Sequence, residues 1–206
     1  MFNKLVIASG NTGKIREISH ILTPLNIKTI PQTELNVPEC EEPFYTFIEN
    51  ALAKARHASK HTGLPSLADD SGLCVDALQG APGTFSARYA GKTPHHHLTT
   101  QDERNNDKLL QVMQHVSQRQ AHFYCVMVLV RHENDPEPII AEGQWHGTIL
   151  REFRGNDGFG YDPLFLDDKT GKTIAELTLD VKSRISHRGH AMRILLQKLE
   201  RLRSHE

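Results

Sequence analysis

A chain of 206 residues has the length of one domain, or of one domain with two lobes, and a domain of that size buries enough surface to fold without disulfides. Apolar residues make up 38% of it and charged residues 24%, as in ordinary globular proteins, which excludes a largely disordered chain. Lysine and arginine number 24 against 25 acidic residues, so the basic excess of a duplex-binding protein is missing and we expect no nucleic-acid partner.

The sequence also argues against a membrane or secreted protein. Its apolar stretch at Val126–Val130 is far shorter than the roughly 20 residues that span a membrane, even with the apolar residues directly before it. The first five residues lead directly into a strand pattern and carry no signal-peptide cleavage site. Three widely separated cysteines without a C-x-x-C pair favour a reduced, cytoplasmic protein; they are Cys40, Cys74 and Cys125.

Strand-like and helix-like segments alternate in the first third of the chain. The clearest helix lies between Pro43 and Gly63, because its apolar side chains form one stripe at helical spacing. In chain order, the predicted elements are a strand at Leu5–Ala8, a helix from about Ile15 to Leu22, a strand at Ile27–Ile30, a helix at Phe44–Lys60 and a strand at Leu64–Ala68.

The rest of the chain adds short extended pieces, one long hairpin and two helices. In chain order, these are extended pieces at Leu73–Leu78 and Phe85–Tyr89, a helix from about Arg104 to His115, antiparallel strands at Ala121–Arg131 and Pro138–Leu150, a glycine-rich loop over 151–163 and a helix from about Arg188 to Arg203. This pattern predicts a mixed β-sheet with helices packed on it, an α/β fold. No repeat or linker divides residues 1–206, so we expect a single domain.

The first candidate site is the turn Ser9–Lys14, between the first predicted strand and the first predicted helix. Backbone N–H groups at a helix start point toward whatever lies there, and the helix dipole and Lys14 add positive charge, so the turn suits a phosphate. It is not a Walker loop, because Gly10 and Gly13 are too close together and Ile15 stands where Ser or Thr would hold Mg²⁺. The alternative is an ordinary turn with a surface lysine.

The second candidate site is a set of carboxylates. Asp69 and Asp70 directly follow an apolar run, where adjacent acids need compensating positive charge. Mg²⁺ held by one or two carboxylates and by substrate phosphates is a common solution, and Glu41 and Glu42 are further candidate ligands. An Asx-type turn that ends the strand is the alternative, but the pair of acids favours the functional interpretation.

Two further segments suit a nucleobase or a phosphate. Gly155–Pro163 combines glycines with two aromatic residues, so it can approach a ligand closely and leave a ring free to stack on a planar base. A flexible connection is the alternative. Lys182–His190 supplies cations near the last helix, although such a segment by itself is more often solvated surface. His95–His97 lack the spacing of a zinc site, and we assign them no role.

Four separated motifs are far more specific together than any one of them. They are Ser-Gly-Asn-x-x-Lys-x-x-Glu at 9–17, Phe-Ile-Glu-Asn-Ala at 47–51, Ala-Asp-Asp-Ser-Gly-Leu at 68–73 and Gly-Phe-Gly-Tyr-Asp-Pro at 158–163. With these motifs, Lys182 and Ser186–Gly189, the chain closely resembles the RdgB/ITPase-like family over essentially its whole length. That family consists of inosine/xanthosine triphosphate pyrophosphatases, which remove deaminated purine nucleotides.

The resemblance implies a fold, a cofactor and a partner. The fold is an elongated mixed β-sheet flanked by helices, with two lobes and the nucleotide cleft between them. The protein is expected to be a homodimer that uses Mg²⁺ to hydrolyse dITP, ITP and XTP to the monophosphate and pyrophosphate. Which of these three it prefers is left open.

The resemblance also implies roles for individual residues. The catalytic residues are Asp70, Asp69 and Lys54, and the metal ligands are Glu42 and Asp70. The substrate-binding residues are Ser9, Gly10, Asn11, Thr12, Gly13, Lys14, Ser71, Phe159, Gly160, Tyr161, Asp162, Lys182, His187 and Arg188. The choice of Asp69 or Asp70 as the base, and of Glu41 or Glu42 as the metal ligand, stays open.

Selectivity requires a hydrogen-bond donor aimed at the purine 6-oxo group, and His187 or Arg188 could supply it. Adenine carries an amino group there and would leave that donor without an acceptor. Guanine also has a 6-oxo group, and no sequence feature identifies what excludes it. Two alternatives remain: a pyrophosphatase for modified pyrimidine triphosphates, and a non-catalytic nucleotide-binding module, which the paired acids argue against.

Overall fold

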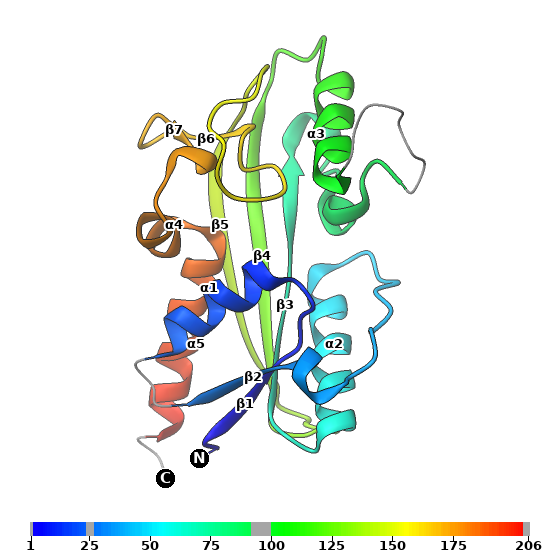
Figure 1. Cartoon of the computed structure of the whole chain (residues 1–206), viewed down its shortest axis with the longest axis vertical. Helices are drawn as coiled ribbons and strands as arrows, with labels where there is room; N and C mark the ends of the chain where they lie inside the picture. Colours follow the sequence, from blue (N-terminus) through cyan, green and yellow to red (C-terminus); the bar gives the residue numbers. More distant parts are fainter. Residues whose placement is uncertain (1, 24–26, 92–99, 204–206) are drawn as a thin grey trace. The chain divides into compact units, whose positions relative to one another are not determined.

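The computed structural model describes residues 2–23, 27–91 and 100–203 (Figure 1). His95–His97 therefore lie outside the described residues. The chain divides into two compact units. Unit 1 comprises Met1–Asp70, Cys125–Gly143 and His187–Glu206, and unit 2 comprises Ser71–Tyr124 and Gln144–Ser186. The predicted nucleotide cleft between two lobes stays a prediction.

Seven strands in the described part of the chain form one sheet in the order β2-β1-β3-β4-β5-β6-β7. Strand β1 pairs in parallel with β2 and with β3, whereas β6 pairs antiparallel with β5 and with β7. The sheet is therefore mixed, and the predicted α/β fold is confirmed. The strands are β1 (Lys4–Ile7), β2 (Lys28–Pro31), β3 (Ser66–Val75), β4 (Gln120–Val130), β5 (Ile139–Ile149), β6 (Phe165–Asp167) and β7 (Lys172–Thr173).

Unit 1 packs helices against the parallel part of the sheet. Its helices are α1 (Thr12–Leu22), the short 3₁₀ helix η2 (Gln32–Leu35), α2 (Phe47–Thr62) and α5 (His187–Arg203). Helix α1 contacts both α5 and β2. A shared apolar core removes side chains of β1, α1, β4 and α5 from water, among them Leu5, Ile18, Met127 and Leu195. This core fixes the start of α1 and the start of α5 relative to β3.

Unit 2 has its own core and its own helices. They are the 3₁₀ helices η3 (Asp76–Leu78), η4 (Gly83–Arg88) and η5 (Ile174–Glu176) and the α-helices α3 (Gln101–Val112) and α4 (Leu179–Ile185). Leu73, Leu109, Trp145 and Phe165 are among its buried side chains. In the described part of the chain, no helix is long and apolar enough to cross a membrane.

Local sequence signals explain where the helices begin and end. Asn11 caps α1 and Thr46 caps α2, each by accepting a hydrogen bond from a backbone N–H of the first turn. Thr100 and Glu103 form a capping box at the start of α3. Gly63, with φ of +65°, ends α2 in the left-handed conformation that glycine adopts most easily.

Several predicted boundaries are wrong. The sequence predicts a strand at 64–68 and a separate extended piece at 73–78, but residues 66–75 form one continuous strand, so the alternative of an Asx-type turn at Asp69 and Asp70 also fails. The strand continues because charged partners compensate both acids within it. The predicted extended piece Phe85–Tyr89 is instead helical in η4. Strands β6 and β7 and helix α4 are too short to show a periodic pattern.

Candidate active site

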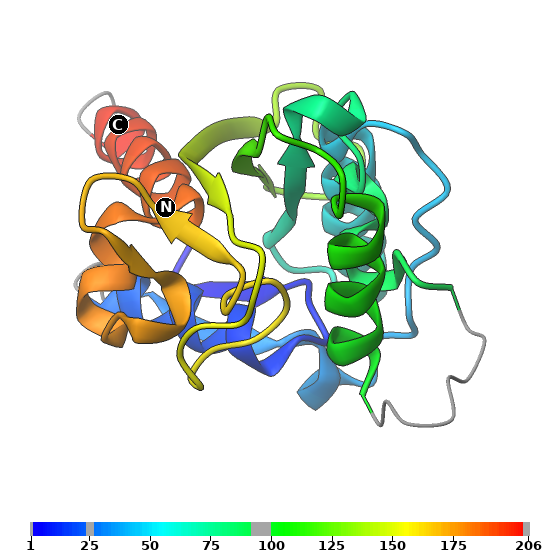
Figure 2. The same ribbon diagram turned by 90° about the horizontal axis from the view of Figure 1, so that it is seen from above.

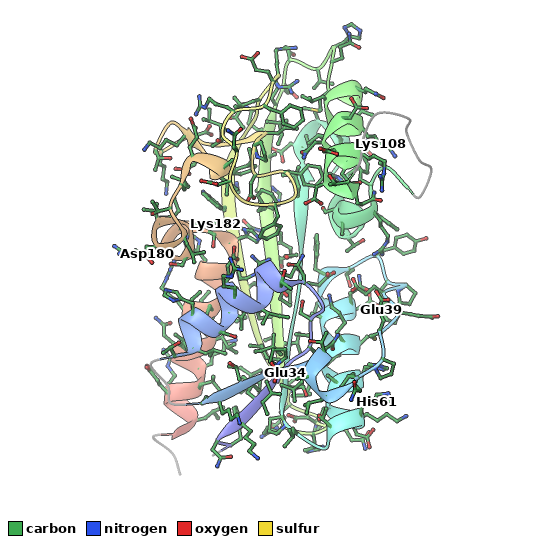
Figure 3. All side chains as sticks on the ribbon, in the orientation of Figure 1. Glu34, Glu39, His61, Lys108, Asp180 and Lys182 are labelled. Carbon is green, nitrogen blue, oxygen red and sulfur yellow. The ribbon has the colours of Figure 1, made fainter. Side chains whose placement is uncertain are left out.

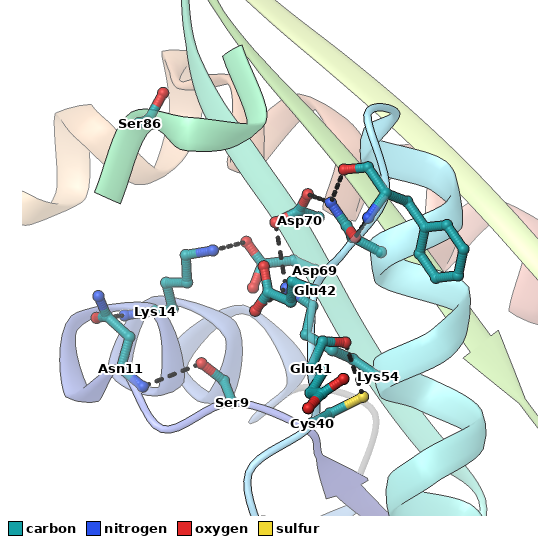
Figure 4. Close-up of polar contacts among 12 residues, drawn as sticks. Ser9, Asn11, Lys14, Cys40, Glu41, Glu42, Lys54, Asp69, Asp70 and Ser86 are labelled. Atoms are coloured by element: carbon teal, nitrogen blue, oxygen red, sulfur yellow. Dashed lines mark hydrogen bonds and ion pairs between the residues drawn. The ribbon is translucent and has the colours of Figure 1, made fainter. Parts of the chain in front are cut away.

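The turn after β1 presents the start of a helix, as its sequence predicts. The N–H of Lys14 donates to Oδ1 of Asn11 at 3.0 Å, and the N–H of Asn11 donates to Oγ of Ser9 at 3.1 Å (Figure 4). Gly10, Asn11 and Thr12 are exposed. Two side chains of the turn therefore brace its backbone, while its outer surface is accessible to an anion.

Asp69 is a fully buried carboxylate that two helices neutralise. Its Oδ2 lies 3.1 Å from Nζ of Lys14 on α1 and accepts hydrogen bonds from Nε and Nη2 of Arg188 on α5, both at 3.3 Å. Arg188 is itself buried and pairs with Glu17 as well. Burial alone would raise the pKa of Asp69, but Lys14 and Arg188 hold it well below its usual range. Asp69 is thus a permanent anion.

Asp70 has different hydrogen-bond and ion-pair partners, two side chains of α2. Its Oδ1 lies 3.2 Å from Nζ of Lys54, and its Oδ2 accepts from Nδ2 of Asn50 at 3.3 Å. Burial raises the pKa of Asp70 above its ordinary value, despite the opposing effect of Lys54 and Lys14. Successive side chains of a strand point to opposite faces, which explains why two adjacent acids meet different helices.

Lys54 joins Asp70 to a third acid. Its Nζ lies 3.3 Å from Oε1 of Glu42, in the loop before α2. Burial lowers the pKa of Lys54, but Asp70, Asp69 and Glu42 outweigh this and raise it. Glu41 is exposed and has no ion pair with Lys54. The geometry therefore favours Glu42 over Glu41 as a partner of Asp70.

The oxygen donors around Lys54 fit a hard cation such as Mg²⁺. Asp70 and Glu42 already share one positive group, so their charge and spacing suit a cation between them. Among the described residues, no three His, Cys, Asp or Glu side chains are arranged to hold a metal. Mg²⁺ typically takes one or two carboxylates and fills its other positions with water and substrate phosphates, which matches a set of this size.

Unit 2 contains the glycine-rich loop that sequence predicts as a base-binding segment. Nζ of Lys182 on α4, labelled in Figure 3, lies 2.8 Å from Oδ2 of Asp162 and 4.4 Å from the centre of the Phe159 ring. The N–H of Phe159 donates to the same Asp162 oxygen at 3.1 Å. Lys182 thus lies over the ring of Phe159 while Asp162 holds the backbone of that residue, so the three residues form one cluster in unit 2.

Tyr161 has a different position from the one expected of a stacking ring. Its side chain is 3% exposed, and its hydroxyl donates to the backbone oxygen of Ser86 at 2.9 Å. Tyr161 is therefore an anchor of the loop in unit 2, and its contact with substrate stays a prediction. Ser71 is partly buried in β3, and His187 is the buried first residue of α5.

The structure brings in two residues to which sequence reasoning gave no role. Glu17 pairs with Arg188, and Asn50 bonds to Asp70 and to both backbone polar groups of Phe44. Helical spacing could have indicated Asn50, because it lies one turn before Lys54 on the same face of α2. No local pattern links Glu17 to a residue 171 positions away.

The sheet carries two adjacent buried acids, and each is paired with its own lysine near the exposed start of α1. This arrangement is typical of the class of α/β proteins that bind polyanions. The model of the Ham1 family matches residues 5–198, and the chain belongs to that family. A protein of Nitrosomonas europaea named dITP/XTP pyrophosphatase is 56% identical over 197 residues, which cover 96% of this chain and 94% of the relative.

Further relatives agree. A protein of the same name from Chromobacterium violaceum is 50% identical over 202 residues, which cover 98% of this chain and all of the relative. A solved Ham1 protein structure from Coxiella burnetii has a TM-score of 0.88 and 48% identity, covering 98% of this chain and all of that one. A Ham1 protein from Staphylococcus aureus has a TM-score of 0.82, 39% identity and coverage of 96% and 98%. The resemblance indicated by the four motifs is confirmed.

Proposed function

We propose that this chain is a nucleoside-triphosphate pyrophosphatase, a hydrolase that cleaves deaminated purine nucleotides such as dITP, ITP and XTP into the monophosphate and pyrophosphate. The observation that carries the proposal is the pair Asp69 and Asp70, two buried neighbouring acids with separate cationic partners. Relatives at 50–56% identity that are named dITP/XTP pyrophosphatase support it.

The triphosphate is bound by the turn Ser9–Lys14 and by the two lysines. The exposed start of α1 and the ammonium group of Lys14 provide positive charge for the phosphate oxygens. Lys54 lies beside Asp70 and Glu42 and supplies a second cation. Electrostatic stabilisation by such fixed groups is usually the largest single contribution to phosphoryl chemistry.

Asp70 is the general base. It accepts a proton from a water molecule while the water oxygen forms a bond to the α-phosphorus and the bond to the bridging oxygen of pyrophosphate breaks. Asp69 is unsuited to this role, because Lys14 and Arg188 occupy its carboxylate and hold its pKa far below neutrality. Asn50 fixes the rotamer of Asp70 by bonding to its second oxygen.

Mg²⁺ is the proposed cofactor, with Glu42 and Asp70 as its protein ligands. When bound, it neutralises charge on the phosphates and lowers the pKa of a bound water. The role of the chain's own residues would be to hold two carboxylates within reach of one cation, beside the ammonium group of Lys54.

The base is recognised by stacking and by a polar contact. Phe159 offers a ring whose position Lys182 and Asp162 fix. His187 is the proposed donor to the purine 6-oxo group, because the guanidinium of Arg188 is bonded to Asp69 and Glu17. A site built around such a contact rejects the mismatched base by roughly 10⁴-fold.

The cellular role follows from this chemistry. Hydrolysis of deaminated triphosphates removes them from the nucleotide pool before polymerases insert them into DNA or RNA. Action as a homodimer in the cytoplasm is part of the proposal, and it rests on the family resemblance rather than on a contact in this chain.

The decisive experiment measures pyrophosphate release from dITP, XTP, dGTP and dATP, each with Mg²⁺ and with EDTA. We expect fast, metal-dependent release from the first two and almost none from the last two. Equal release from all four would contradict the base-recognition proposal, and preference for a modified pyrimidine triphosphate, included as a fifth substrate, would replace it with that alternative. No release from any triphosphate would leave only a nucleotide-binding module.

A further inference from the structure

Within unit 2, the loop between β5 and β6 lies between α3 and α4, as Figures 1 and 2 show from two directions. Its contacts with Lys182 of α4 are part of the proposed base site. Its contacts with α3 are separate from that site and involve two side chains with no role so far, Asp102 and Asn106. They are four residues apart and therefore share one face of the helix.

Asp102 and Asn106 bond to the two polar groups of a single residue, Gly160. The N–H of Gly160 donates to Oδ2 of Asp102 at 2.7 Å, and Nδ2 of Asn106 donates to the carbonyl oxygen of Gly160 at 2.8 Å. The N–H belongs to the peptide plane before the glycine and the carbonyl to the plane after it. Because the backbone has only two soft dihedrals per residue, fixing both planes fixes φ and ψ of Gly160.

Those two dihedrals control the direction of the neighbouring ring. On one side of Gly160, Tyr161 is buried and anchored to Ser86. On the other side stands Phe159, the proposed stacking residue. Gly160 has a φ of +61° and no Cβ to restrict it, so rotation there would swing Phe159 relative to the anchored Tyr161.

Neither side chain is explained by helix formation alone. Glu103 already completes the capping box of α3, so Asp102 is not needed for that purpose. Asn106 is 4% exposed, and its Oδ1 has no hydrogen-bond partner among the described residues. A buried amide that uses its donor group on a loop carbonyl indicates that the loop contact determines its position.

We propose that Asp102 and Asn106 are positioning residues that lock Gly160 and thereby set the place of the Phe159 ring and the selectivity for the base. This inference rests on the proposed function, because it concerns the same substrate. Neither residue touches the nucleotide in this scheme, and both act through the backbone of the loop.

The test compares Asp102→Ala and Asn106→Leu with the wild type in steady-state kinetics on dITP and dGTP. Each loses one hydrogen bond to Gly160, so we expect KM for dITP to rise about three- to tenfold. The ratio of kcat/KM between dITP and dGTP falls with it. Asp102→Asn keeps an acceptor oxygen and restores both values. Asp107→Ala, the same change on the same helix, removes only a bond to Gln111 and serves as the matched control.

A second readout is independent of activity: hydrogen exchange at the Gly160 amide, followed by NMR, becomes faster in Asp102→Ala and not in Asp107→Ala. The inference fails if folded variants keep KM and selectivity within twofold of the wild type, or if kcat alone falls. If Asn106→Leu does not fold, the comparison of Asp102→Ala with Asp102→Asn tests the inference. A wild type that releases no pyrophosphate from dITP overturns the proposed function and this inference together, whereas an active wild type with unaffected variants overturns only the inference.

Discussion

At the scale of single residues, the central feature is the contrast between Asp69 and Asp70. They are adjacent in β3 and both buried, yet α1 and α5 supply the partners of one and α2 supplies those of the other. Two full cations compensate Asp69, while one lysine shared with Glu42 faces Asp70. The same residue type is therefore a fixed structural anion at one position and a candidate base at the next.

The two acids should respond differently to the same substitution. Asp70→Asn removes the base but leaves Glu42 as an anionic partner of Lys54, so we expect kcat on dITP to fall by about 10²–10⁴-fold with little change in melting temperature. Asp69→Asn leaves Lys14 and Arg188 without their shared anion, so the free energy of unfolding should fall by about 1–3 kcal/mol. Parallel kinetics and thermal unfolding check both. Near-normal turnover of Asp70→Asn at saturating Mg²⁺ would contradict the assignment.

At the scale of elements, single buried side chains hold the ends of helices and strands. Arg119, just before β4, is 8% exposed and donates to four backbone carbonyls. Two of the acceptors, Met113 and Val116, follow α3, and the other two lie at the end of β5 and just beyond it, Ile149 and Leu150. One guanidinium thus ties the segment after α3 to the end of β5 through four backbone carbonyls.

Loss of this contact should be costly. Arg119→Met keeps most of the apolar stem but removes the hydrogen bonds to all four carbonyls, so we expect the free energy of unfolding to drop by about 2–4 kcal/mol. Arg119→Lys should recover only part, because an ammonium group cannot reproduce the geometry of the guanidinium fork. Urea unfolding measures both. Equal stability of all three proteins would show that water replaces these bonds.

The turn between β4 and β5 contains a similar device that depends on pH. Asp135 is fully buried and accepts from the N–H and side chain of Arg131 and from the N–H of Glu137. The hydrogen bonds from Arg131 hold the pKa of Asp135 well below its usual value. Because the pKa is lower in the folded state, this stabilisation is present at neutral pH and is lost as the pH falls below about 4.

Asp135→Asn should remove that contribution. We expect its free energy of unfolding to be about 1–3 kcal/mol below that of the wild type at pH 7, with the difference shrinking as the pH falls from about 4 toward 2. Urea unfolding at a series of pH values tests this. A difference that stays constant over the whole range would mean that Asp135 titrates alike in the folded and unfolded chains.

At the scale of the whole molecule, sequence predicts the fold class better than it predicts which distant residues become partners of the candidate site residues. The apolar stripe of α2 and the motif 68–73 can be read locally, because periodicity and residue type suffice. The continuation of β3 through Asp69 and Asp70 cannot be predicted from local sequence, because it depends on cations from α1, α2 and α5. The anchoring role of Tyr161 likewise depends on Ser86, 75 residues earlier.

The link between Glu17, Asp69 and Arg188 joins the first, the middle and the last part of the chain. During synthesis, Asp69 and Glu17 emerge long before Arg188, so a growing chain must keep both acids near water or with Lys14 alone. Their joint burial becomes favourable only when α5 arrives. Formation of the complete charge cluster is therefore coupled to the synthesis and docking of α5, and a chain truncated before residue 187 would carry an unfinished charge cluster in its core.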